Sequence, residues 1–273
     1  MSTPSTIRSG VGFRHCQVFG LDSNGYPAAT STTAYEGLHV SGVKALTIND
    51  PEPRQITHAG DDRVIALDVL PPQEAVTGEL KVAKVNDVVD ALLTGQLSFT
   101  VGEAKLFGIG TNERGNEVQV GLLAYRQTLD TDPDSANFGA RRWEFRLMPK
   151  VILVPREGSL DENPEERVYG VYPQFVTKHL WGASFADGTE GFTQAQVLRG
   201  ISEYKSNLVA FQGDGTTVEF SFPTDAQAVS TDKITVWVDG VEQTSGITKA
   251  TDKITFTAAP SSGAMIVVFY ETA

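Results

Sequence analysis

The residues whose spacing comes closest to a site for chemistry are three alternating aspartates, Asp130, Asp132 and Asp134. Alternating oxygen ligands open a calcium-binding loop, which then needs glycine at position six and a bidentate glutamate at position twelve. Those two positions hold Ser135 and Arg141. The pattern therefore predicts a solvated acidic loop in preference to a metal site, and a metal-assisted hydrolase is the alternative that rests on this loop.

Other combinations of residues point away from catalysis. The four histidines are scattered without the i, i+4 pairing that metal ligation usually shows. The glycine-rich stretch 108–115 lacks the Lys-Ser/Thr ending of a phosphate-binding loop, so a hairpin turn explains it better. Cys16 has Arg14 and His15 as its nearest basic neighbours, which is too weak a pattern for a nucleophile. We predict that the chain is not an enzyme and binds no cofactor or metal.

Composition narrows the class of protein further. The 273 residues include 34 acids and 22 bases, for a net charge of -12, which argues against gripping nucleic acid or anionic lipid. A single cysteine excludes an internal disulfide framework. No apolar run reaches the length of a membrane helix, and residues 1–10 show no secretory signal. We expect a soluble acidic protein that folds in a reducing compartment.

The secondary-structure elements that position these residues are predicted to be mainly β-strands. Residues 142–154 form the strongest candidate, because apolar Trp143, Phe145 and Leu147 alternate with charged neighbours. Further β-type stretches occupy 64–70, 119–126, 168–176 and 197–204. One segment, 84–95, instead spaces its apolar residues as a helix does and ends at Gly95. We expect this single α-helix to flank a sheet.

A change of character near Ser206 predicts two domains, 1–206 and 207–273. The second has no arginine, three lysines and eight acids, and its short strands follow one another closely. Asp239-Gly240 is a strong hairpin signal between two of these strands. The pattern predicts a small C-terminal β-sandwich.

Two long polar stretches, 129–139 and 155–167, flank the strongest strand. Long polar loops on a rigid β scaffold are frequent places for contacts with partners. The acidic residues in them are therefore our candidates for assembly contacts. They are Asp130, Asp132, Asp134, Asp161, Glu162, Glu165 and Glu166.

Two passages resemble a known family. The first, 53–95, contains Gly-Asp-Asp-Arg at 60–63 and Leu-Asp-Val-Leu-Pro-Pro at 67–72, and it resembles the major tail protein (tail tube protein) of bacteriophages with long, non-contractile tails. The second, 211–260, contains Phe-Gln-Gly-Asp-Gly at 211–215 and Val-Trp-Val-Asp-Gly at 236–240. It looks like an immunoglobulin-like module that recurs in phage tail and fibre proteins.

The resemblance implies a β-sandwich or partial barrel with one flanking α-helix, plus a small C-terminal immunoglobulin-like sandwich that decorates the outside. It implies a homohexameric ring, stacked into a tube that conducts the tape-measure protein and then the genomic DNA, without sequence-specific DNA binding. Tail terminator and distal tail proteins are the implied partners. The implied location is the virion tail, assembled in the host cytoplasm.

The alternative function is a receptor-binding or distal tail component that touches cell-surface glycan through residues 207–273. Trp237, Phe256 and Tyr270 motivate it, because aromatic rings can stack on sugars. Their positions on strand patterns favour a role in the core of the sandwich. A weak contact of this module with the host surface is also compatible with the tube subunit.

Overall fold

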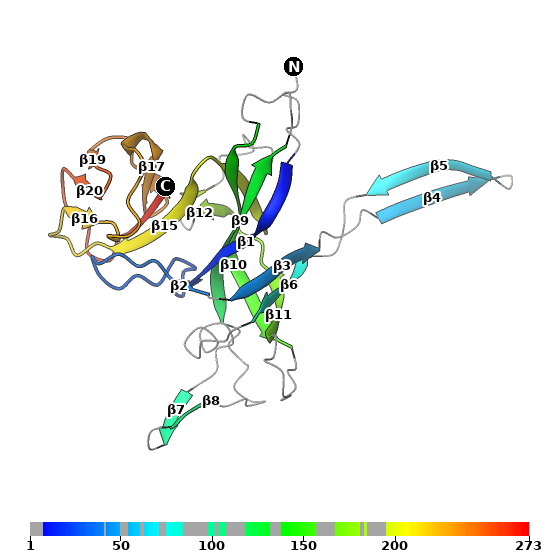
Figure 1. Ribbon diagram of the computed structural model, residues 1–273, viewed down its shortest axis with the longest axis horizontal. Coiled ribbons are helices and arrows are strands. Elements are labelled where there is room, and N and C mark those ends of the chain that lie inside the picture. Colours follow the sequence, from blue (N-terminus) through cyan, green and yellow to red (C-terminus); the bar gives the residue numbers. More distant parts are fainter. Residues whose placement is uncertain are drawn as a thin grey trace.

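A computed structural model gives the fold of the chain, which is mainly β and built from several antiparallel sheets (Figure 1). It describes residues 8–40, 42–49, 54–60, 63–70, 75–83, 98–101, 104–107, 118–131, 138–156, 167–180, 183–184 and 195–272.

The main sheet has eight strands in the order β2-β1-β9-β10-β11-β6-β3, with β14 also paired to β10. Strand β10 accommodates two neighbours on one side because it is 15 residues long: β14 pairs with its first half and β11 with its second. A bulge between Met148 and Val151 separates the two halves. The strands are β1 (Arg8–Gly20), β2 (Leu38–His39), β3 (Val43–Asn49), β6 (Thr77–Val82), β9 (Gln119–Asp130), β10 (Arg141–Pro155), β11 (Arg167–Pro173) and β14 (Leu198–Ser202).

The main sheet curves around an apolar core on its inner face. We define this face by Cys16, Leu122 and Met148, which lie in one buried cluster with residues from β6, β11 and the segment before β3. Because the sheet curves, Leu80 and Val82 of β6 share this buried cluster with residues of β1, although β1 and β6 are not paired with each other. Alternation along the strands leaves Phe19, Leu123 and other apolar residues on the opposite, outer face.

The C-terminal region forms two facing sheets, β15-β21-β17-β18 and β16-β20-β19, with an aromatic-rich core between them. The prediction of short, closely spaced strands in this region is confirmed. Asp239 and Gly240 both have the positive φ values, 50° and 82°, that a tight two-residue hairpin requires. The strands are β15 (Lys205–Gln212), β16 (Glu219–Ser221), β17 (Ile234–Val238), β18 (Val241–Glu242), β19 (Ile247–Lys249), β20 (Lys253–Phe256) and β21 (Met265–Thr272).

The C-terminal region packs directly on the main sheet through a contact that we call the seam. Leu208, Trp237 and Val267 from the C-terminal region share a buried cluster with Leu123 and Leu147 on the outer face of the main sheet. The predicted boundary between residues 206 and 207 falls inside β15. The two parts are therefore joined by an apolar interface as well as by the chain.

The segment between β1 and β2 adds a backbone link across the seam. Tyr35 and Ala210 exchange two backbone hydrogen bonds of 2.9 and 3.0 Å, so this segment pairs with β15. The hydroxyl of Tyr35 accepts a 2.9 Å hydrogen bond from the N–H of Gly20, at the end of β1. One short segment is thus bonded to both parts of the molecule.

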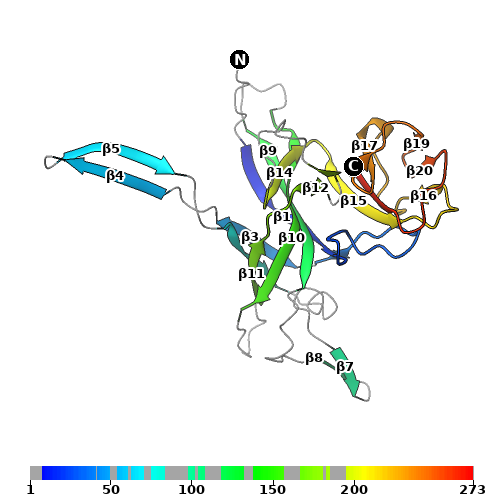
Figure 2. The ribbon, with the colours of Figure 1, turned by 180° about the vertical axis from the view of Figure 1, so that it is seen from behind.

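Three two-stranded hairpins lie outside these sheets. The longest joins β4 (Arg54–Gly60) to β5 (Arg63–Leu70), and both views show it extending away from the main sheet (Figures 1 and 2). A shorter hairpin, β7 (Ser98–Val101) with β8 (Ala104–Phe107), projects in a different direction. The third pairs β12 (Lys178–Leu180) with β13 (Ala183–Ser184).

The predicted flanking α-helix is not borne out. Its residues, 84–95, lie outside the described part of the chain, and the described residues contain a single 3-10 turn, η1 (Thr231–Lys233), as their helical element. Consistent with this, no described helix is long and apolar enough to cross a membrane.

Replacing Trp237 at the seam tests whether the two parts unfold together. Trp237→Ala is expected to lower the free energy of unfolding by about 3–5 kcal/mol, because it removes a large buried side chain and leaves a cavity. Urea unfolding followed by circular dichroism should show one transition shifted as a whole. The control is Val241→Ala on β18, where the side chain is 64% exposed and the change should be within about 0.5 kcal/mol. Two separate transitions in the wild-type chain would contradict a shared seam.

Candidate functional site

The most unusual polar group in the described structure is the carboxylate of Glu144 on β10, which is 2% exposed. The register of the paired strands determines which residues lie beside Glu144. Glu144 lies opposite Arg126 on β9 and opposite Ile201 on β14, and Arg199 follows two positions from Ile201 on the same face of β14. Three strands thus bring one acid and two bases together on the inner face of the main sheet.

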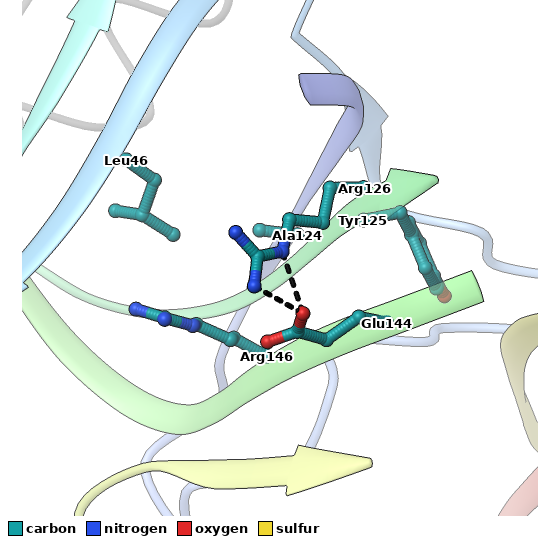
Figure 3. Close-up of a pocket in the computed structure, with 6 residues that line it drawn as sticks. All are labelled: Leu46, Ala124, Tyr125, Arg126, Glu144 and Arg146. Atoms are coloured by element: carbon teal, nitrogen blue, oxygen red, sulfur yellow. Dashed lines mark hydrogen bonds and ion pairs between the residues drawn. The ribbon is translucent and has the colours of Figure 1, made fainter. Parts of the chain in front are cut away.

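Both arginines contact the buried carboxylate. Nε and Nη2 of Arg126 each lie 2.5 Å from Oε2 of Glu144, as Figure 3 shows, and Nε of Arg199 lies 2.7 Å from Oε1. The side chains of Arg126 and Arg199 remain 44% and 59% exposed. Because the guanidinium groups keep contact with water, they neutralise Glu144 without the full desolvation cost of a completely buried ion pair.

A hollow opens beside this cluster, between β3 and the strands β9 and β10. Its lining includes Leu46, Ala124 and the side chain of Arg146, whose guanidinium lies on the same side as that of Arg126 (Figure 3). Among the described residues, no carboxylate lies within ion-pair distance of Arg146. The hollow therefore presents positive charge that Glu144 does not balance. Chemically it suits an anion, and a carboxylate above all, because guanidinium groups bind carboxylates through paired hydrogen bonds.

A second polar cluster lies at the seam. Burial raises the pKa of Glu36, and the charge of Asp225 raises it further, whereas the ammonium of Lys205 opposes both effects. Burial lowers the pKa of Lys205, and Asp225 and Glu36 partly offset this. Nearby, the amide of Asn207 donates a 3.1 Å hydrogen bond to the hydroxyl of Tyr270. These groups are drawn from four separate chain segments, so the cluster supports the seam.

The structure describes one of the seven acidic residues that we predicted as assembly contacts, Asp130. Asp130 is the last residue of β9, pairs in register with Arg8 of β1 and is 2% exposed. The prediction that it lies in a solvated loop is wrong, because the β1–β9 ladder extends further than the sequence pattern indicated. The other candidates lie outside the described residues. They are Asp132, Asp134, Asp161, Glu162, Glu165 and Glu166.

The three aromatic residues that motivated glycan binding are all buried. Trp237 lies in the seam, and Phe256 and Tyr270 lie in the core between the two C-terminal sheets. Rings in these positions cannot stack on a sugar, so the core interpretation is confirmed and the alternative function loses its motivating residues.

Two chemistries can be assessed directly in the described part of the chain. The thiol of Cys16 is fully buried, and burial raises its pKa to about 12, so it stays protonated near neutral pH and is a poor nucleophile. Within the described ranges, no group of three or more His, Cys, Asp or Glu side chains is arranged to hold a metal ion.

Sequence comparisons add no family assignment: no protein-family model matches the chain, and no curated protein matches it.

Removing the arginines one at a time and together tests the cluster. Arg126→Ala or Arg199→Ala alone should cost about 1 kcal/mol of unfolding free energy, because Glu144 keeps one partner. The double substitution should cost about 3–5 kcal/mol, since it leaves a buried carboxylate without a counter-charge. Urea unfolding measures all three values.

The matched control repeats these substitutions in a Glu144→Gln background, where the two effects should simply add. If the two losses of unfolding free energy were additive both with Glu144 present and in the Glu144→Gln background, the arginines would not act through Glu144.

Proposed function

We propose that this chain is a structural subunit of a phage tail tube, which self-assembles into stacked hexameric rings around a channel. The observation that carries the proposal is the β4–β5 hairpin, a two-stranded sheet that extends away from the main sheet (Figures 1 and 2). A two-stranded hairpin is marginally stable alone in water. A long hairpin held away from the body is therefore suited to contact another subunit.

The main sheet offers a second argument for assembly. Its path ends at β2 on one side and β3 on the other, and no ladder joins these two among the described strands. Unpaired strand edges tend to pair with other chains unless they are covered. In the proposed ring, the curved sheet is a partial barrel whose edges meet those of neighbouring subunits, which removes this hazard.

Charge supports the proposed conduit. A chain with net charge -12 repels DNA phosphates, so genomic DNA passes through the channel without adhering to it. The tape-measure protein occupies the same channel before ejection, and tail terminator and distal tail proteins close the two ends. The particle is the virion tail, built in the host cytoplasm.

The C-terminal region is an immunoglobulin-like module in this proposal, but the seam alters its expected role. An appended decoration needs little contact with its carrier, whereas this module shares a buried apolar cluster with the main sheet. We therefore propose that residues 207–273 stabilise the subunit as well as covering the outside of the tube.

Deleting the hairpin tests the function. Replacement of residues 54–70 by a short glycine-rich turn should leave the fold intact, because β4 pairs with β5 and with no other described strand. Wild-type protein at high concentration should form rings or tubes with a central channel in electron micrographs, and the hairpin variant should not.

Glu242→Ala on the exposed strand β18 is the control and should assemble normally. Circular dichroism checks that each variant is folded. Absence of rings or tubes in wild-type preparations under all conditions would overturn the proposed function, whereas tubes that persist without the hairpin would overturn its role in assembly.

A further inference from the structure

The hollow between β3, β9 and β10 is lined by two guanidinium groups that Glu144 does not fully occupy. Arg126 contacts Oε2 of Glu144 through Nε and Nη2, and its third nitrogen points away from that carboxylate, on the side of Leu46 (Figure 3). Arg146 lies on the same face of β10 as Glu144 and makes no ion pair with any described residue. Each guanidinium has five N–H donors in a rigid fork. Donors of both arginines therefore remain for a ligand in the hollow.

The charge around the hollow is positive. Arg199 lies opposite Arg146 in the β10–β14 ladder and contacts Oε1 of Glu144, whereas Arg126 contacts Oε2 from β9. Three guanidinium groups thus surround one carboxylate, which leaves two positive charges without a described counter-charge. The hollow therefore attracts an anion, although the chain as a whole has a net charge of -12.

The size and the lining of the hollow indicate what kind of anion it takes. Its volume is about 60 Å³, so it has room for a single small group. Leu46 and Ala124 supply apolar lining beside the arginines. A carboxylate can turn both oxygens toward guanidinium groups and its carbon toward this apolar lining. A phosphate carries oxygens on all sides, so at least one would meet apolar surface without a donor, which is costly.

Contacts already present in the structure prepare the site for a carboxylate. The carboxylate of Glu144 is 2% exposed and holds Arg126 and Arg199 in place before a ligand arrives. Less side-chain freedom is then lost on binding. The apolar lining lowers the local exposure to water and so strengthens charge-assisted hydrogen bonds.

We propose that this hollow is a binding site for one carboxylate group, held between the guanidinium groups of Arg126 and Arg146. A free small carboxylic acid and an acidic side chain of a partner protein present the same group, and the experiment below distinguishes these two sources. The site goes beyond the proposed tube function and does not depend on it.

Titration of the full chain with sodium acetate tests the site. Acetate is added at constant ionic strength against chloride, and NMR follows the Nε–H signals of the arginine side chains. The signals of Arg126 and Arg146 should shift and saturate. Arg146→Gln should weaken acetate binding at least about tenfold, because it removes a charged hydrogen-bonding partner. Arg146→Lys should bind with intermediate affinity, since it keeps the charge and loses the paired hydrogen bonds.

Matched probes identify the source of the carboxylate. Glutamate capped as N-acetyl methylamide resembles an acidic side chain in a protein, and glutamine capped in the same way is its uncharged control. Tighter binding of the capped glutamate than of acetate assigns the site to a partner's side chain, and weaker or equal binding assigns it to a free acid. The capped glutamine should not bind in either case.

Arg141→Gln is the matched control variant. Arg141 lies at the start of β10, is exposed and does not line the hollow, yet its replacement changes the net charge as Arg146→Gln does. It should bind acetate within about twofold of the wild type, because salt screens a distant charge. Circular dichroism checks that each variant is folded, and Arg146→Lys takes the place of Arg146→Gln if the latter does not fold.

Three results would overturn the proposal. The first is the absence of a saturable shift with acetate and with the capped glutamate. The second is an equal loss of binding in the Arg146 and Arg141 variants. The third is tighter binding of dimethyl phosphate, which carries one negative charge as acetate does and mimics the nucleic-acid backbone. None of these measurements requires rings or tubes to form, so the site and the proposed function can fail separately.

Discussion

Burial of both faces of the sheet formed by β15, β21 and β17 determines how the rest of the molecule is arranged. Along β15, Val209 and Phe211 face the core between the C-terminal sheets, whereas Leu208 and Ala210 face the seam. A strand buried on both sides is apolar at nearly every position. Such a sheet cannot be left with one face in water, so the main sheet must cover it.

This requirement explains several features that otherwise look unrelated. The outer face of the main sheet is apolar where the seam lies, and the segment containing Tyr35 leaves β1 to pair with β15. The titratable groups Glu36 and Lys205 face each other at the edge of the same contact and modify each other's pKa. The C-terminal module therefore behaves as part of one folded unit, although its composition marks it as distinct.

The sequence predicts strands well where alternation is strong and the strand is regular. Strand β10, with Trp143, Phe145 and Leu147 on one face, and β17, ahead of Asp239-Gly240, are both confirmed. The sequence pattern predicts no strand at β1, although β1 lies inside the main sheet between β2 and β9. Its glycines lower the β propensity, and two register shifts interrupt the period of two. Its longest pairing, with β9, joins residues a hundred or more positions apart in the sequence.

The contacts of Glu144 with Arg126 and Arg199 show why a site of this kind is hard to find from sequence alone. In the sequence, Glu144 is one of the charged residues that alternate with apolar ones, and alternation alone does not tell whether the charged face of the strand meets water. Its partners, Arg126 and Arg199, are adjacent to it through the register of three strands. The available signal was the alternation of Arg142, Glu144 and Arg146, an acid between two bases on one face.

Net charge and local charge lead to different conclusions about binding. The total of -12 describes how the whole molecule meets a polyanion at long range, where repulsion dominates. At contact distance, screening shortens the range to about 8–10 Å, so a partner within the hollow senses mainly the nearby arginines. A molecule that is acidic overall can therefore still present a local positive site, here the hollow lined by Arg126 and Arg146.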